Sequence, residues 1–127
     1  MEIQTERIGS VDVVAASGRL DAIYSTAFAK QVGELLTGSQ PKVLLDFSDI
    51  DFVTSAGLRA VLLLLNKATA AGGVFALCGV NDQVREVLDI SGLAAMFSIH
   101  SGRAEGLTAL EAIAPIAANN PPTSPAR

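Results

Sequence analysis

The chain has 127 residues, 50% of them hydrophobic and 17% charged, which suits one globular domain with a single core and is too short for two. Nine Lys and Arg against thirteen Asp and Glu give a net charge of -4, and the basic residues form no stripe. This balance argues against binding to a phosphate backbone, so we expect no nucleic-acid partner.

The few residues that could hold a metal or form a disulfide are isolated. Cys78 is the one cysteine and His100 the one histidine, so neither an internal disulfide nor a His/Cys zinc site can form. Cys78 lies within an apolar run and is expected in the core. We therefore expect no metal and no cofactor.

The N-terminus lacks the basic and apolar segments of a secretory signal. The longest apolar stretch, residues 58–65, is interrupted by Arg59 and is far shorter than the ~20 residues that cross a bilayer. We expect a cytoplasmic protein that does not insert into a membrane.

The first part of the chain predicts a hairpin, a helix and a buried strand. Residues 3–8 and 11–17 alternate as two strands around the turn residues Gly9 and Ser10. A continuous apolar run at 42–47 is typical of a central strand covered on both faces. Between them, apolar residues recur at helical spacing and predict an amphipathic helix that ends at residues 37–38. These residues are Phe28, Val32, Leu35 and Leu36.

The rest of the chain alternates helices and short strands. Residues 48–54 predict a short acidic connection, and Asp82 is expected to cap a helix that stops at Gly92. Such alternation indicates βαβ units, so we expect an α/β fold with a mostly parallel sheet, an N-terminal hairpin and about four helices. The further expected elements are a helix at 55–71, a strand at 74–78, a strand at 97–99 and a helix at 101–113.

Residues 117–127 contain three prolines and no apolar period. This composition predicts a disordered tail that follows a single domain spanning residues 1–116.

The densest polar feature lies where the predicted central strand leads into the second helix. Asp46, Asp49 and Asp51 are followed by the hydroxyls of Thr54 and Ser55. Sites in open parallel sheets gather at such junctions, beyond the carboxyl ends of strands. The simplest interpretation gives Thr54 or Ser55 only a capping role at the helix, with the aspartates favoured by the helix dipole.

Enzymatic interpretations of the same segment find less support. A nucleophilic serine needs a base, and His100 belongs to a different connection. The three aspartates could hold magnesium, yet no glycine-rich phosphate loop accompanies them. A small hydrolase using Asp and Ser is kept as the third hypothesis, behind two drawn from a resemblance.

Five segments in order carry that resemblance. They read GRLD at 18–21, VLLDF at 43–47, FVTSAGLR at 52–59, LCG at 77–79 and VREVLDISGL at 84–93. Together they resemble the STAS domain, whose single-domain members are the bacterial anti-sigma factor antagonists, and the match covers about residues 3–113.

The resemblance implies a partner-switching protein and no enzymatic activity. In that family a hydroxyl residue at the start of the helix is phosphorylated by an anti-sigma factor that is itself an ATP-dependent serine kinase, and Ser55 matches this position. The unphosphorylated form binds the kinase and frees its sigma factor, the phosphorylated form does not bind, and a PP2C-type phosphatase removes the phosphate. Asp21 matches the family's acidic residue near the phosphosite.

Two residues depart from the family pattern. Thr54 stands where the family usually has Asp, and Ala56 stands where a second hydroxyl is common. Thr54 is therefore an accessory candidate for phosphorylation. The second hypothesis is a phosphorylation-independent STAS adaptor subunit of a lipid-transport ABC complex.

A helical wheel of residues 55–71 completes the expected site. Arg59, Leu63 and Asn66 fall on the side opposite the predicted core stripe, so we expect them to be exposed beside Ser55, with Leu63 as an apolar anchor. Nearby aspartates predict a negative edge that favours a basic partner surface. The predicted core stripe consists of Leu58, Val61, Leu62 and Leu65, and the predicted partner-binding residues are Asp21, Thr54, Ser55, Gly57, Arg59, Leu63 and Asn66.

Overall fold

The computed structural model describes residues 1–113, so the predicted boundary at residue 116 and the predicted tail lie outside the described residues. Five strands form one sheet in the order β1-β2-β3-β4-β5. The strands are β1 (Glu2–Ile8), β2 (Val11–Leu20), β3 (Lys42–Val53), β4 (Val74–Cys78) and β5 (Ser98–His100). The helices are α1 (Ser25–Gly33), α2 (Ser55–Ala70), α3 (Asp82–Ser91) and α4 (Arg103–Glu111), with short 3-10 helices η1 (Glu34–Leu36) and η2 (Leu93–Met96).

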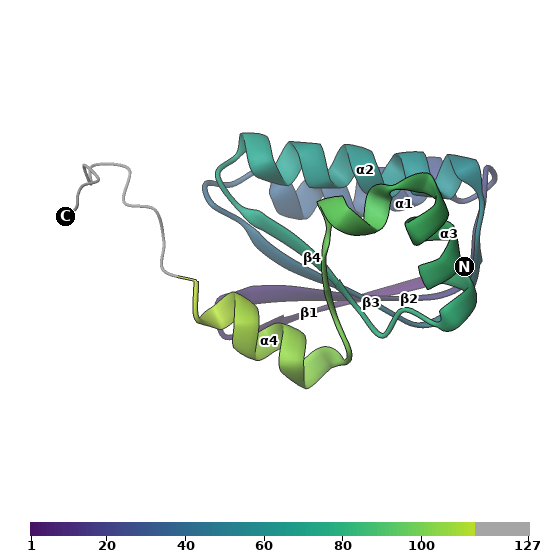
Figure 1. Cartoon of the computed structure of the whole chain (residues 1–127). Helices are drawn as coiled ribbons and strands as arrows, with labels where there is room; N and C mark the ends of the chain where they lie inside the picture. The colour runs from purple at the N-terminus through teal and green to yellow at the C-terminus, as the bar shows by residue number, and fades with distance from the viewer. Residues whose placement is uncertain (114–127) are drawn as a thin grey trace.

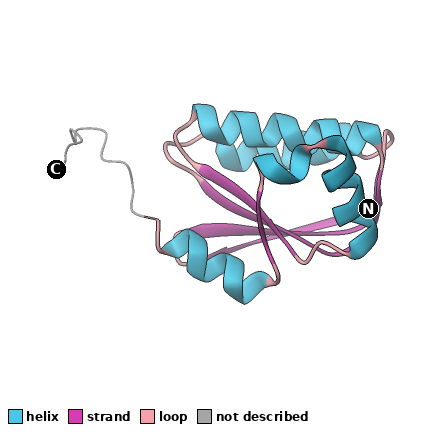
Figure 2. Ribbon diagram, in the orientation of Figure 1, coloured by secondary structure: helices cyan, strands magenta, loops and turns pink. Residues whose placement is uncertain are grey.

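The helices lie on both faces of the sheet. Figure 1 shows α1, α2 and α3 on one face and α4 on the other, and the colouring in Figure 2 separates these layers from the strands between them. The larger core lies under the first three helices, and a smaller one, built around Leu44 and Leu110, lies under α4.

The sheet has the predicted connectivity. The β1 and β2 strands pair antiparallel across a turn in which Gly9 has a φ of +61°, and the other neighbours pair parallel. The predicted central strand is β3, whose residues 43–47 are buried between β2 and β4. A run of apolar side chains suits this position because both faces are covered.

The acidic segment at 48–54 is not the predicted connection. Residues 48–53 continue β3, because β2 also extends beyond its predicted end and pairs Leu20 with Val53. The register shifts twice along this pairing, so the alternation that marks a strand is interrupted. Ile50 and Val53 are buried, whereas Asp49 and Asp51 are exposed.

Helix boundaries differ from the prediction by small amounts with local causes. The α3 cap is Asn81 and not Asp82: its Oδ1 accepts a hydrogen bond from the Val84 N–H (2.8 Å), and its Nδ2 donates to the Ile50 carbonyl (2.9 Å). The helix stops at Gly92 as predicted, with a φ of +80° that glycine adopts readily. The last strand and helix also shift, to 98–100 and 103–111.

The buried side of α2 is rotated from the predicted stripe. Val61 is buried as expected, but Leu58, Leu62 and Leu65 are only half-buried. The other buried positions are Gly57, Ala60, Leu64 and Ala68. Most of these residues are small, because α2 lies close to the sheet and to α1. A helical wheel that selects large apolar residues as the core stripe therefore misses them.

Candidate functional site

The start of α2 is anchored to the end of β2. The Thr54 N–H donates to the Leu20 carbonyl (3.0 Å), and the Thr54 hydroxyl lies 3.4 Å from the same oxygen. Thr54 Oγ1 also accepts from the Gly57 N–H (3.3 Å), which makes Thr54 the N-cap of α2. The capping role that the sequence left open between two hydroxyls therefore belongs to Thr54.

Gly57 explains how α2 comes so close to β2. It is buried, and a Cβ at this position would collide with the Leu20 carbonyl and lie 2.9 Å from Leu20 Cγ and 3.0 Å from Val53 Cγ1. Only a residue without a side chain fits here without a shift. Gly57 was predicted to bind the partner, but it is buried, so its role is to allow close packing and it is not part of the exposed surface.

Ser55 is the first residue of α2 and is exposed. Because Thr54 supplies the cap, the Ser55 hydroxyl has no hydrogen bond to any residue in the described part of the chain. Arg59, one turn further along, is also exposed and makes no ion pair within residues 1–113. Positions four apart share one side of a helix, so a free hydroxyl and a free guanidinium lie on neighbouring turns.

Asp21 shapes the turn between β2 and α1. Its Oδ1 accepts hydrogen bonds from the N–H groups of Ile23 (3.0 Å) and Tyr24 (3.3 Å). This is the turn-stabilising role that a short acid at this position favours, and the N-cap position of α1 is Tyr24, whose side chain makes no capping hydrogen bond. The carbonyl of the adjacent residue, Leu20, accepts the hydrogen bond from the Thr54 N–H. The Asp21 turn and the start of α2 therefore lie together, at the edge of the sheet formed by the C-terminal ends of β2 and β3.

Large apolar side chains are exposed at this edge. Ile23 is 79% exposed, and Tyr24 (40%) and Phe52 (45%) are also partly open. The Arg19 guanidinium lies 5.6 Å from the centre of the Phe52 ring, a cation–π distance. Apolar groups gathered around a polar position are typical of an interaction surface.

A groove between α1 and α2 continues this surface. Leu63 lies on its α2 side and is 59% exposed, as predicted, and Arg59 and Asn66 are exposed as well. The groove has a volume of about 320 Å³. Its lining residues are Ser25, Thr26 and Ala29 from α1 and Ala56, Arg59, Ala60 and Leu63 from α2.

The α1 side of this groove was missing from the sequence-based prediction. The sequence did hold a signal: Ser25 and Ala29 are four residues apart, and so are Ala56 and Ala60. Small residues at this spacing leave a channel along a helix. The sequence alone could not show that the two channels face each other.

The predicted negative edge loses one of its three aspartates. Asp46 is 8% exposed and lies on the α4 face, where its Oδ2 accepts from Arg103 Nη2 (2.9 Å) and Nε (3.1 Å). Burial opposes its charge, but hydrogen bonds from the Ser48 hydroxyl and N–H and from Arg103 outweigh it and lower the pKa of Asp46. Asp49 and Asp51 remain exposed on the last part of β3.

The other chemically reactive side chains lie apart from Ser55. His100 Nε2 is 2.9 Å from Ser98 Oγ on β5. Cys78 is fully buried in β4, as predicted, and burial with the nearby Asp46 charge raises its pKa to about 12, which keeps the thiol protonated. Within residues 1–113, no three His, Cys, Asp or Glu side chains are placed to hold a metal ion, and no helix is long and apolar enough to cross a membrane.

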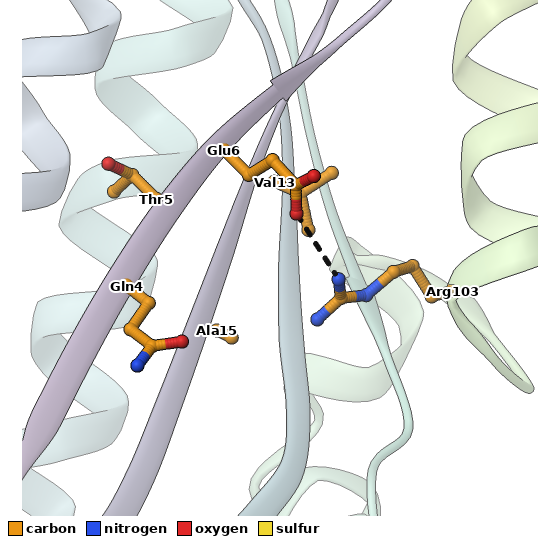
Figure 3. Close-up of a pocket in the computed structure, with 6 residues that line it drawn as sticks. All are labelled: Gln4, Thr5, Glu6, Val13, Ala15 and Arg103. Atoms are coloured by element: carbon orange, nitrogen blue, oxygen red, sulfur yellow. Dashed lines mark ion pairs between the residues drawn. The ribbon is translucent and has the colours of Figure 1, made fainter.

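A second hollow, of about 250 Å³, lies on the α4 face of the sheet. Figure 3 shows Glu6 and Arg103 pointing toward each other across it, with a separation of 3.8 Å between Oε1 and Nη1. Gln4, Thr5, Val13 and Ala15 complete its lining. Because the charges of Glu6 and Asp46 already surround Arg103, this hollow offers less to an anion than the open guanidinium of Arg59 does.

Comparison with known proteins places this geometry in a family. The STAS domain matches residues 2–106. The chain is 31% identical over 114 residues to the anti-sigma F factor antagonist of Paenibacillus polymyxa, covering 89% of this chain and 97% of that one. Both the family match and this relative span the start of α2, where Thr54 and Ser55 lie.

Solved structures show the same fold. The anti-sigma-factor antagonist (STAS) domain protein from Planctomyces limnophilus superposes with a TM-score of 0.80 at 24% identity, over 87% of this chain and 98% of that one. The Bacillus cell fate determinant SpoIIAA in its phosphorylated form gives 0.66 at 19% identity, over 85% and 98%. With the family match over residues 2–106, the relative from Paenibacillus polymyxa and its five-stranded mixed sheet, the chain belongs to the STAS domain family.

Proposed function

We propose that this protein is an anti-sigma factor antagonist that works by partner switching and has no catalytic activity of its own. In its unphosphorylated form it binds an anti-sigma factor that is an ATP-dependent serine kinase, and the sigma factor is released. Phosphorylation of Ser55 ends this binding, and a PP2C-type phosphatase restores it. The protein acts in the cytoplasm.

The observation that carries the proposal is the state of Ser55. Its hydroxyl is exposed and free of hydrogen bonds within the described residues, and it occupies the position that the family phosphorylates. A substrate hydroxyl has to enter a kinase active site, and one that caps a helix would first have to give up its bond. Thr54 carries that bond, so Ser55 is available and Thr54 is the poorer acceptor.

A phosphate on Ser55 would change the surface without unfolding it. It adds a charge of about -1.5 to -2 beside a helix N-terminus, which favours negative groups. The cap at Thr54 and the contact of Gly57 with Leu20 do not involve the Ser55 side chain. The partner, docked against a neutral hydroxyl and apolar neighbours, then meets charge and bulk, which is enough to break a modest interface.

Phosphotransfer tests the proposal directly. The purified protein is incubated with ATP and each anti-sigma factor kinase encoded in the same genome, and intact mass and peptide mapping locate the phosphate. We expect one phosphate on Ser55, none on Ser55→Ala, and unchanged phosphorylation of Thr54→Asp, which keeps a capping side chain.

Calorimetric titration supplies the binding side of the test. Ser55→Ala should bind the kinase constitutively, and Ser55→Glu should bind at least about tenfold more weakly, as expected when charge is placed in an interface. Equal affinities of the two variants would contradict partner switching. If no kinase binds or phosphorylates the protein, the result would instead support the alternative, a phosphorylation-independent STAS adaptor subunit of a lipid-transport ABC complex, for which the absence of the usual Asp at position 54 is the motivating feature.

A further inference from the structure

We propose that the groove between α1 and α2 is the docking site for an apolar side chain of the partner that stands next to a carboxylate, and that Arg59 binds this carboxylate. This inference rests on the proposed function and specifies the partner's contact surface. It assigns to α1 a role in recognition that was missing from the sequence-based prediction.

The shape and chemistry of the groove favour an apolar guest. Its volume is about 320 Å³, and three alanines and Leu63 form most of its walls. Water released from such walls favours association. Ser25 is buried and Thr26 lies at the α1 side, so hydroxyls line only part of one wall.

The charge at the groove favours an acidic neighbour. Arg59 is the one ionisable residue of the lining, and its guanidinium has no partner within residues 1–113. By contrast, the Arg85 guanidinium on α3 is paired with Asp89 (3.3 Å) and that of Arg103 with Asp46 (2.9 Å). An unpaired arginine beside an apolar groove therefore selects a carboxylate over an amine.

The groove also lies next to the switch residue. Ala56 follows Ser55 directly and forms part of the lining, and Arg59 is one turn away from Ser55. A phosphate on Ser55 would compete with the partner's carboxylate for Arg59. The same guanidinium thus recognises the partner in one state and neutralises the phosphate in the other.

The groove can be tested without any partner. Nuclear magnetic resonance of the ¹⁵N-labelled protein is followed during titration with hexanoate, hexanol and hexylamine, which share an apolar chain and differ in charge. We expect the largest shifts at the groove residues and about fivefold tighter binding of hexanoate than of hexylamine, as one surface ion pair allows. Arg59→Gln should abolish this preference, and Arg85→Gln should keep it.

Binding to the kinase forms the second part of the test. Leu63→Ala and Arg59→Glu should each weaken binding at least about fivefold, while Ile90→Ala, which truncates an exposed side chain on α3, should bind as the wild type does. If the wild type binds the kinase and Leu63→Ala and Arg59→Glu bind it equally well, the proposed role of the groove is wrong. The proposed function would not be affected by that result. Absence of any kinase binding would overturn the proposed function. The proposal for the groove is then tested by the titrations alone, and it is refuted if hexanoate binds no more tightly than hexylamine.

Discussion

Two adjacent hydroxyl residues have separate tasks in this protein. Thr54 closes the first turn of α2 and contacts the Leu20 carbonyl, whereas the Ser55 hydroxyl points to no group in the described residues. The sequence left the cap open between these two hydroxyls, and because Thr54 is the cap, replacing Ser55 by Ala removes no capping hydrogen bond. The loss of stability that follows from removing the cap is expected at Thr54.

Thr54→Ala should lower the free energy of unfolding by about 1 kcal/mol, because the Gly57 N–H loses its acceptor. Urea unfolding followed by circular dichroism measures the change. Thr54→Asp is the matched control, since Asp is as good a capping residue and should keep most of the stability. Ser55→Ala should stay within ~0.5 kcal/mol of the wild type. A larger loss in Ser55→Ala than in Thr54→Ala would contradict this assignment of the cap.

Asp46 makes stability depend on pH in the acid range. Its pKa in the folded protein lies below the usual value of 3.8, so the folded state favours the charged form. The resulting stabilisation is present above pH 3.8 and is lost as the pH falls through the lowered pKa. At neutral pH, Asp46→Asn should lower the free energy of unfolding by about 2 kcal/mol, because Arg103 loses charged hydrogen bonds.

The difference between Asp46→Asn and the wild type should therefore shrink in acid. Urea unfolding at pH values from neutral to well below 3.8 tests this expectation. Asp51→Asn, an exposed position on the same strand, serves as the control and should differ little from the wild type at any pH. A gap between Asp46→Asn and the wild type that stays constant across the range would refute the role given to this carboxylate.

At the scale of elements, the position of α2 depends on small residues. Gly57 allows the first turn to approach the β2 end, and Ala60 and Ala68 are buried further along. Helices α1 and α2 enclose the groove, and Ala56 and Ala60 are among the α2 residues that line it. A feature that stabilises the fold thus also creates the surface assigned to the partner.

Gly57→Ala should lower the free energy of unfolding by at least about 1 kcal/mol, although alanine favours helix. The added methyl would collide with the Leu20 carbonyl, which is backbone and cannot rotate away. Gly38→Ala is the control, because no atom lies within 4 Å of a Cβ at that position, and it should be nearly neutral in the same urea unfolding experiment. An unchanged stability of Gly57→Ala would show that α2 does not depend on this close approach.

At the scale of the whole molecule, β3 organises the fold. It pairs with β2 and β4, its residues 43–47 are buried, and helices cover both faces of the sheet around it. By contrast, β1 and β5 are the edges of the sheet, and most of β1 is exposed. The site at the end of β3 is therefore built on the most enclosed strand.

Amide hydrogen exchange should reproduce this order. The amides of residues 43–47 should exchange only through global unfolding, and those of residues 4–7 in β1 should exchange at least about tenfold faster through local opening. Exchange measured by nuclear magnetic resonance resolves the two groups. Slower exchange in β1 than in β3 would contradict the central place of β3.

The sequence by itself determined the α/β class, the opening hairpin, the strand at 74–78 and the helix stop at Gly92. These features follow from local chemistry: alternation, helical spacing and glycine at a positive φ are properties of neighbouring residues. It also singled out Ser55 through its likeness to a family, and the exposure of Leu63 through helical geometry.

Tertiary structure decided what depends on distant partners. The 48–53 segment became strand because β2 lies beside it, and Asp46 left the negative edge because Arg103, 57 residues further on, pairs with it. The groove exists because small residues on α1 and α2 face each other across the helix pair. No local pattern encodes such contacts, because each depends on packing that forms only when the whole sheet and its helices have assembled.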